Sequence, residues 1–191
     1  MRLAVLVSGT GTILDAMADA GLPVSLVVAD RPCRAIDLAA GHGIPTSVVV
    51  RDSFGDDFDR TAYTEKLTAE LDAADIDLVA MAGFGTILEQ PIYGRFAGRI
   101  LNTHPSLLPA FPGWRAVEEA LAHGVQVTGC TVHYAELEVD SGPILAQETV
   151  PVLPDDDVAS LHERIKAVER RLYIETIRGL VAASPAGGGP E

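Results

Sequence analysis

Asn102 and His104 stand two residues apart, at the end of a short apolar segment and directly before a proline. Residues two apart in a β-strand point to the same side of the sheet, so the two side chains would face one site. A histidine donates or accepts a proton near neutral pH, and an asparagine amide stabilises a developing oxyanion. A lone histidine at a strand end is usually structural, but the adjacent asparagine and the proline-bounded loop PSLLP favour catalysis.

Asp140 stands in a second turn, in the sequence VDSGP of residues 139–143. A carboxylate beside His104 would favour the charged imidazolium and fix the orientation of the ring. The sequence leaves a purely structural turn equally open. His104, His133 and Asp140 are an alternative set of ligands for a divalent metal, but they lack the close spacing of a metal-binding motif. We therefore predict acid–base chemistry that needs no metal.

A glycine-rich turn, SGTGT at residues 8–12, follows the first apolar segment and precedes a helical pattern. Such a turn exposes N–H groups at a helix N-terminus, which favours a phosphate. It resembles the start of a dinucleotide-binding fingerprint, and Asp30 ends the next apolar segment, where an acid could hold a ribose. However, Leu14 stands where that fingerprint has its third glycine. The turn therefore favours a monophosphate over a dinucleotide or a purely structural role.

Short apolar segments alternate with helical periodicity through the first half of the chain. The expected strands are residues 3–7, 24–29, 46–50, 78–81 and 100–101, and the expected helices are 13–20, 35–40, 59–71 and 86–96. Continuously apolar strands separated by helices indicate a parallel sheet that is covered on both faces. We also expect strands at 126–134 and 143–152, and then a helix with acidic residues 155–157 in its first turn. The sequence predicts one α/β domain, Rossmann-like and doubly wound around a mostly parallel sheet, over residues 1–183, with a flexible tail over 184–191.

Composition excludes several classes of partner. With 14 basic and 27 acidic side chains the net charge is −13, which opposes binding to a nucleic-acid backbone through bulk charge. No segment approaches the roughly 20 apolar residues of a membrane helix, and the N-terminus lacks the pattern of a signal peptide. Cys33 and Cys130 form no C-x-x-C pair and are expected to be buried free thiols. These features fit a cytoplasmic protein without a nucleic-acid or membrane partner.

Three segments resemble the folate-dependent formyltransferases: NTHPSLLP at residues 102–109, FPG at 111–113 and VTGCTVHYAELEVDSGPILAQ at 127–147. The resemblance spans almost the whole chain. The length fits the single-domain branch that formylates glycinamide ribonucleotide in purine synthesis, because related enzymes carry an extra domain. The resemblance implies transfer of a formyl group from 10-formyltetrahydrofolate to that amine, without a metal. It implies small-molecule substrates and a monomer or homodimer.

The resemblance also implies roles for particular residues. Asn102, His104 and Asp140 match the catalytic trio of the family. The expected contacts to the amine substrate are Gly9, Thr10, Gly11, Thr12 and Ile13, chiefly at its phosphate, and Glu169 at its polar groups. The expected folate site comprises Arg60, Gly85, Thr86, Ile87, Leu88, Asn102, Glu136, Val139 and Asp140, flanked by residues 114–117.

Three positions depart from the family pattern. Ile13 stands where many members have Asn, Gly85-Thr86 where Met-Arg is usual, and Trp114-Arg115 where a small residue and a His are frequent. We therefore expect phosphate capture through backbone N–H groups, and a pocket that lacks a basic side chain at Thr86. The departures leave two alternatives open: a formyltransferase for another amine, such as an amino sugar nucleotide, or a non-catalytic relative that binds folate or a nucleotide.

Overall fold

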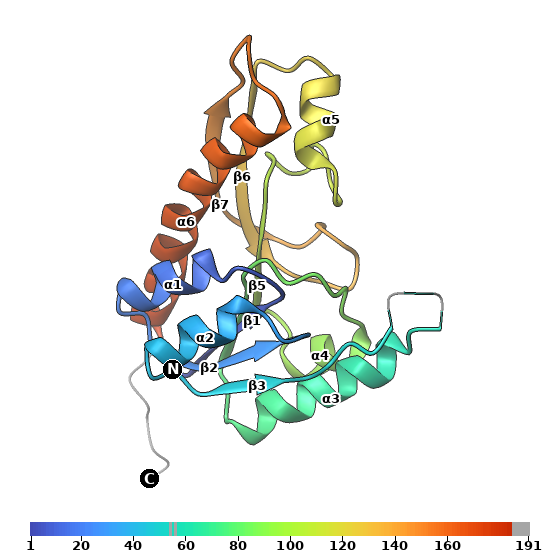
Figure 1. The fold of residues 1–191 in the computed structure, drawn as a ribbon, viewed down its shortest axis with the longest axis vertical. Helices are drawn as coiled ribbons and strands as arrows, with labels where there is room; N and C mark the ends of the chain where they lie inside the picture. Colours follow the sequence, from blue (N-terminus) through green and yellow to red (C-terminus); the bar gives the residue numbers. More distant parts are fainter. Residues whose placement is uncertain (54, 56, 185–191) are drawn as a thin grey trace.

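The computed structural model describes residues 1–53, 55 and 57–184, in which one sheet lies between two layers of helices (Figure 1). The strands are β1 (Leu3–Val7), β2 (Val24–Ala29), β3 (Thr46–Val48), β4 (Leu78–Met81), β5 (Ile100–His104), β6 (Val127–Tyr134) and β7 (Ile144–Pro151). The helices are α1 (Thr12–Asp19), α2 (Arg34–Gly41), α3 (Arg60–Ala73), α4 (Gln90–Arg95), α5 (Ala116–Ala122) and α6 (Val158–Ala183).

The sheet has the strand order β3-β2-β1-β4-β5-β6-β7. The first five strands in this order run parallel, whereas β6 is antiparallel to both β5 and β7. The chain builds outward from β1 to β3 and then from β4 on the other side, so the order reverses between β1 and β4. Open α/β sheets bind ligands at the carboxyl ends of the strands beside such a reversal. The predicted doubly wound α/β fold with a mostly parallel sheet is confirmed.

The side chains of β1 alternate between two apolar cores. Leu3, Val5 and Val7 pack with residues of α1, α2 and α6, whereas Ala4 and Leu6 pack with residues of α3 and α4. Figure 1 shows these two groups of helices on opposite sides of the sheet. Because successive strand residues point to opposite faces, a strand covered on both faces must be apolar throughout. Burial on both faces holds the carboxyl edge of the sheet, and therefore the loops that leave it, in fixed positions.

α6 begins at a reciprocal N-terminal cap. The Asp157 carboxylate accepts a hydrogen bond from the Ser160 N–H at 2.8 Å, and the Ser160 hydroxyl accepts one from the Asp157 N–H at 3.0 Å. These bonds satisfy N–H groups that the first turn leaves unpaired. The sequence predicted Asp157 within the first turn, but it is the N-cap residue. From this start α6 packs along β6 and β7 and carries Glu169 to the edge of β5.

The helix predicted for residues 86–96 forms only over Gln90–Arg95. Pro91 lies in its first turn, where a missing N–H costs nothing, and Glu89 before it is extended. Residues 85–89 instead form a loop, which the hydrogen bond from Thr86 to Asp30 holds against β2. β5 extends beyond the predicted residues 100–101 to His104, and the sequence missed α5, which is too short to show clear periodicity.

Of the tail predicted for residues 184–191, only Ser184 lies among the described residues, where it caps the end of α6. Within the described ranges, no helix combines the length and the apolar character needed to cross a membrane. Cys33 and Cys130 are free thiols, as predicted. Cys130 is buried, and burial raises its pKa to about 12, whereas Cys33 is only partly buried.

Candidate active site

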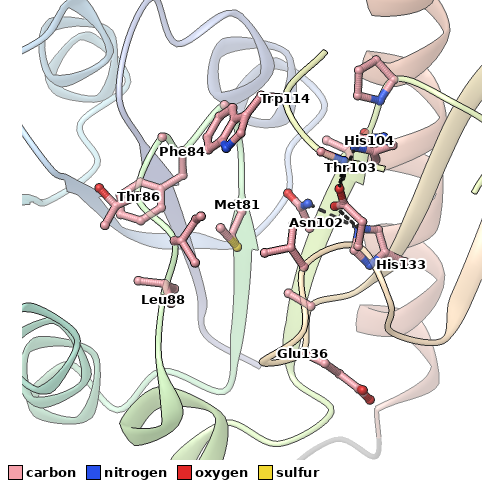
Figure 2. A pocket seen from close by; sticks show the side chains of 18 of the residues that line it. Met81, Phe84, Thr86, Leu88, Asn102, Thr103, His104, Trp114, His133 and Glu136 are labelled. Atoms are coloured by element: carbon pink, nitrogen blue, oxygen red, sulfur yellow. Dashed lines mark hydrogen bonds and ion pairs between the residues drawn. The ribbon is translucent and has the colours of Figure 1, made fainter. Parts of the chain in front are cut away.

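A cavity of about 380 Å³ opens at the carboxyl edge of the sheet (Figure 2). One wall is the segment after β4, residues 83–88, and the other comprises the end of β5, His133 of β6 and the loop before β7. α6 contributes His162 and Glu169. The volume is typical of a small-molecule site. The structure brings Asn102, His104 and Asp140 together in this cavity.

His104 is held between a backbone carbonyl and the Asp140 carboxylate. Its Nε2 lies 2.7 Å from the carbonyl oxygen of Phe111, which can only accept, so Nε2 carries a proton. Its Nδ1 lies 3.3 Å from Asp140 Oδ2, and both side chains are about 95% buried, with exposed fractions of 6% and 5%. A neutral Nδ1 would turn its lone pair toward the carboxylate, whereas a protonated Nδ1 forms an ion pair. Both ring nitrogens of His104 thus face an oxygen that can accept a hydrogen bond.

His133 orients the amide of Asn102. The antiparallel register of β5 and β6 places the two residues directly opposite each other. Nδ1 of His133 lies 2.8 Å from the carbonyl oxygen of Tyr134 and therefore carries the ring proton, which leaves Nε2 to accept a hydrogen bond from Asn102 Nδ2 at 3.3 Å. Burial lowers the pKa of His133 and thus favours this neutral form. Because one N–H of Asn102 is occupied, the amide keeps one orientation with its second N–H available.

The loop between β5 and α5 holds both partners of the ion pair. The carbonyl of Phe111 accepts a hydrogen bond from His104, and the N–H of Gly113 donates one to Asp140 Oδ2 at 2.8 Å. Gly113 has a φ of 89°, a left-handed conformation that glycine adopts without strain. Both contacts are made by backbone groups. Every residue type carries such groups, so these contacts could not be predicted from the sequence.

Thr103 and Glu169 meet on the other side of β5. Because strand side chains alternate, Thr103 points away from Asn102 and His104, and its hydroxyl donates to Glu169 Oε1 at 3.0 Å. Burial raises the pKa of Glu169, and the hydrogen bond from Thr103 offsets this effect only in part. Both residues line the cavity. Glu169 thus offers a partly buried carboxylate to a ligand.

The predicted phosphate turn lies beside the cavity rather than in its lining. It comprises Gly9, Thr10, Gly11, Thr12 and Ile13 at the start of α1. Gly11 is the N-cap residue with a φ of 75°, and a Cβ there would lie 2.8 Å from Ala35 of α2, so this position requires glycine. No side chain caps the first turn of α1. The N–H of Gly85 donates to Ser8 Oγ at 2.7 Å and joins the turn to the cavity wall.

Thr86 bonds to the protein interior. It is 1% exposed, and its hydroxyl donates to Asp30 Oδ2 at 2.9 Å. Arg31 binds the same carboxylate through two nitrogens, at 2.9 and 3.1 Å. Burial alone would raise the pKa of Asp30, but hydrogen bonds from Arg31, Ser8 and Thr86 outweigh it and hold the pKa below its usual range. Asp30 is fully buried, so it is closed to a ribose and gives no support to a dinucleotide site.

Two arginines lie near the segment of residues 85–88 without lining the cavity. Nη2 of Arg31 is 3.5 Å from the position that a Cβ would occupy at Gly85. Arg60, a predicted folate contact, begins α3, whose next residue Thr61 donates a hydrogen bond to Glu89. A guanidinium therefore stands beside Gly85 although position 86 carries none. The structure does not bring Arg60 into the cavity lining.

The remaining predicted folate residues lie in the two walls: Gly85, Thr86, Ile87 and Leu88 in one, and Asn102, Glu136, Val139 and Asp140 in the other. The sequence missed Met81, Phe84 and Tyr93, which line the first wall. Their apolar side chains are typical of any sheet core, so sequence alone gave no sign of this role. Together these residues make the first wall largely apolar, as expected for a site that holds a flat ring.

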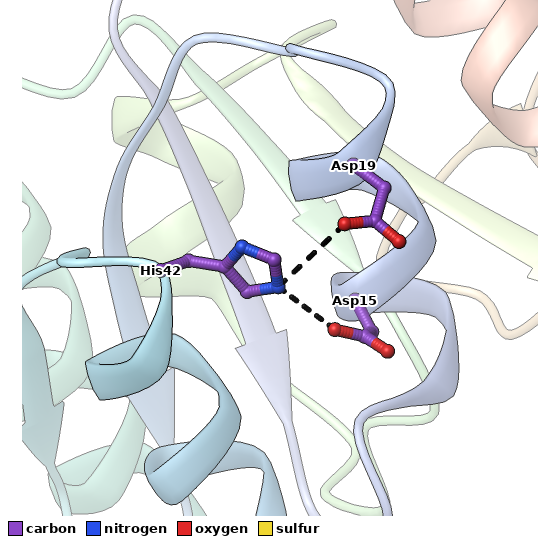
Figure 3. Close-up of side chains that lie close together, drawn as sticks. All are labelled: Asp15, Asp19 and His42. Carbon is purple, nitrogen blue, oxygen red and sulfur yellow. Dashed lines mark hydrogen bonds and ion pairs between the residues drawn. The ribbon is translucent and has the colours of Figure 1, made fainter.

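Among the described residues, side-chain atoms able to bind a metal converge at one place, formed by Asp15, Asp19 and His42 (Figure 3). His42, the residue that follows α2, has its Nε2 2.8 Å from Asp15 and 4.0 Å from Asp19, both in α1. None of the three lines the cavity. In the cavity, His104 and His133 each direct one ring nitrogen to a backbone carbonyl.

We expect His133→Ala to lower kcat about tenfold, because Asn102 remains but its amide turns freely. Complete loss of a donor to an oxyanion, the role predicted for Asn102, costs roughly a hundredfold. Since burial lowers the pKa of His133, the ring becomes charged only below its ordinary range, and protonation then removes the acceptor for Asn102. In His133→Gln, an amide oxygen replaces that acceptor at every pH. The acidic fall in kcat should therefore be weaker in His133→Gln than in the wild type. Identical pH profiles of the two proteins would contradict this role.

Comparison with known proteins agrees with the geometry of the cavity. The formyl transferase family model matches residues 1–177. Phosphoribosylglycinamide formyltransferase of Mycobacterium tuberculosis (strain H37Rv) is 48% identical over 184 residues, which cover 94% of this chain and 84% of that protein. The protein of the same name from Bacillus subtilis is 31% identical, with 97% of each chain covered. A crystal structure of glycinamide ribonucleotide transformylase 1 from Symbiobacterium toebii superposes with a TM-score of 0.90 at 40% identity, covering 99% of this chain and 91% of that one. The chain belongs to the formyl transferase family.

Proposed function

We propose that the protein transfers the formyl group of 10-formyltetrahydrofolate to the primary amine of glycinamide ribonucleotide, in purine synthesis. The observation that carries this proposal is the pairing of His104 with Asp140 beside an amide of fixed orientation, Asn102. These groups line a cavity at the carboxyl ends of β4 and β5, beside the reversal of the strand order, where open α/β sheets bind ligands. The names of the relatives in M. tuberculosis and B. subtilis support the choice of this amine.

In this reaction the amine nitrogen attacks the formyl carbon, and negative charge develops on the formyl oxygen. The free N–H of Asn102 and the charged His104 stabilise that oxygen. Nε2 of His104 is committed to the Phe111 carbonyl, so Nδ1 is the ring nitrogen that serves the reaction and shares its proton with Asp140. The attacking nitrogen loses a proton and N10 of the folate gains one as the bond between N10 and the formyl carbon breaks. The Asp140 carboxylate is placed to relay that proton.

The two substrates would approach from different sides of the trio. The uncapped N-terminus of α1, with Gly9, Thr10, Gly11, Thr12 and Ile13, offers backbone N–H groups to the phosphate. Since Ile13 adds no hydrogen-bond donor, this capture depends on the backbone. Glu169 would accept hydrogen bonds from the polar groups of the amine substrate. The folate would occupy the walls formed by residues 85–88 and 136–140, with Arg60 beyond the lining.

Steady-state kinetics with 10-formyltetrahydrofolate and two amines test this proposal. The expected result is rapid formylation of glycinamide ribonucleotide and a kcat/KM at least about a hundredfold lower for an amino sugar nucleotide. In that compound the amine stands on a sugar ring at a different distance from the phosphates, so the amine cannot reach the trio while a phosphate binds the turn before α1. A reversed preference would assign the protein to the other amine. Binding of folate without formyl transfer to either amine would show a non-catalytic relative.

Glu169→Gln should raise the KM for glycinamide ribonucleotide roughly tenfold, because a hydrogen bond to a charged group contributes about 1.5–3 kcal/mol. The same change should not lower the melting temperature at neutral pH. Since burial raises the pKa of Glu169, the folded chain binds its proton more tightly than the unfolded chain, and stability falls as pH rises through this range. Glutamine carries no charge, so it removes the loss of stability that comes from burying an ionised carboxylate. The matched control is Glu175→Gln, an exposed glutamate on the same helix, which should leave KM unchanged.

A further inference from the structure

Trp114 is the only tryptophan of the chain, and it is 74% exposed although it lines the cavity (Figure 2). A side chain of this size usually contributes its apolar area to a core or to an interface. Val139, in the loop before β7 that also lines the cavity, is unusually exposed for an apolar residue as well, at 47%. A cluster of apolar side chains at the mouth of a cavity marks a surface that a ligand covers.

The backbone next to Trp114 is fixed by the catalytic residues themselves. The preceding N–H, of Gly113, donates to Asp140, and the carbonyl of Phe111 accepts from His104. On the other side, α5 begins two residues later, at Ala116. The indole is therefore attached to a segment of defined position, within one residue of the group that contacts Asp140.

We infer that Trp114 stacks on the p-aminobenzoyl ring of the folate and thereby positions N10 beside Asn102 and His104; this inference rests on the proposed function. The formyl carbon must lie at the catalytic trio, and the p-aminobenzoyl ring is bonded directly to N10. That ring is therefore the aromatic group of the folate nearest to Asp140, and Trp114 directly follows Gly113, whose N–H contacts the same carboxylate. Glycinamide ribonucleotide has no aromatic ring for an indole to cover.

Phe84 gives the ring a second apolar neighbour in the opposite wall of the cavity (Figure 2). It is almost fully buried, at 7% exposure, and so is already supported by the core, whereas Trp114 is supported by no comparable packing. A bound ligand would therefore leave the apolar surroundings of Phe84 unchanged, whereas the surroundings of Trp114 would change from water to an apolar group. Ligand binding should therefore be visible at Trp114 in particular.

The affinity of Trp114 variants for two folate compounds tests the inference. The probes are a non-reactive analogue with carbon in place of N10, and a pterin that ends before the p-aminobenzoyl group, both titrated by calorimetry. We expect Trp114→Ala to lower the affinity for the analogue roughly tenfold. Trp114→Phe should lower it less than about threefold, because phenylalanine retains a stacking ring. Neither change should alter the affinity of the truncated pterin. Leu153→Ala, at another exposed apolar residue, is the control for loss of apolar surface outside the cavity lining.

Tryptophan fluorescence of the unaltered chain, excited at a wavelength that tyrosine does not absorb, gives an independent measurement, since all tryptophan emission comes from Trp114. The analogue should protect the indole from collisional quenching by acrylamide, whereas glycinamide ribonucleotide alone should not. This experiment needs no variant and so does not depend on the folding of Trp114→Ala.

Three results would overturn the inference. The wild type and Trp114→Ala could bind the analogue with equal affinity, or Trp114→Ala could lose as much affinity for the truncated pterin as for the analogue. Glycinamide ribonucleotide alone could also protect the indole from acrylamide. Protection that grows with protein concentration without ligand would instead show that a second copy covers Trp114. Formyl transfer by the wild type is measured in parallel. Active enzyme with unchanged Trp114→Ala affinity contradicts only this inference, whereas folate binding without transfer contradicts the proposed function.

Discussion

His104→Ala is expected to lower kcat at least about a hundredfold, the usual size of an acid–base contribution. The variant removes both the positive charge beside the formyl oxygen and the proton at Nδ1 that the ring shares with Asp140. It also leaves the Asp140 carboxylate, with its 5% exposed side chain, without its cationic partner. Single-turnover kinetics at saturating substrates measure the effect on the chemical step, and the melting temperature shows whether the fold is retained.

His42→Ala is the matched control, because His42 contacts Asp15 of α1 from the end of α2 and does not line the cavity. It should leave kcat unchanged. A His104→Ala enzyme that turns over at a near-native rate would remove His104 from the mechanism, and the choice of formyl transfer by this trio would then have no support.

Asp140→Asn should lower kcat by a similar factor, about a hundredfold. In the proposed mechanism the carboxylate stabilises the charged imidazole and relays the proton from the amine to N10. The substitution keeps the shape of the side chain and an oxygen that can accept from the Gly113 N–H, so the loop between β5 and α5 should stay in place. We therefore expect a loss in kcat with little change in KM for either substrate.

The same change at an exposed aspartate, Asp37→Asn in α2, controls for the loss of one negative charge from a strongly acidic chain. A rise in KM with an unchanged kcat in Asp140→Asn would show that the carboxylate only binds substrate, and proton transfer would then have to be assigned to another group.

The arrangement of the sheet could be predicted, and so could the position of Asn102 and His104 on the same side of β5, because both depend on local periodicity. Strands that are apolar at every position, such as β1, indicate burial on both faces, and residues two apart in β5 must share one side. The glycine-rich turn before α1 could likewise be recognised from its sequence, whereas the left-handed φ of Gly11 and its close approach to Ala35 are seen only in the structure.

The partners of these residues could not be predicted, because they depend on contacts between distant parts of the chain. His133 serves Asn102 only because β6 pairs with β5 in one particular register. Thr86 was expected to mark a missing basic group, yet its hydroxyl binds Asp30, which lies 56 residues earlier in the chain. The helix predicted over residues 86–96 failed for a related reason, since helical periodicity continues through residues that tertiary contacts hold in a loop.

Transfer of an isotope-labelled formyl group tests the central claim most directly. The protein is mixed with formyl-labelled 10-formyltetrahydrofolate and glycinamide ribonucleotide, and the products are analysed by mass spectrometry. The account predicts that the label appears on the amine of glycinamide ribonucleotide, that it leaves the folate in equal amount, and that His104→Ala slows the transfer at least about a hundredfold. Label that remains on the folate, or that is released as free formate while the ribonucleotide is unchanged, would contradict it.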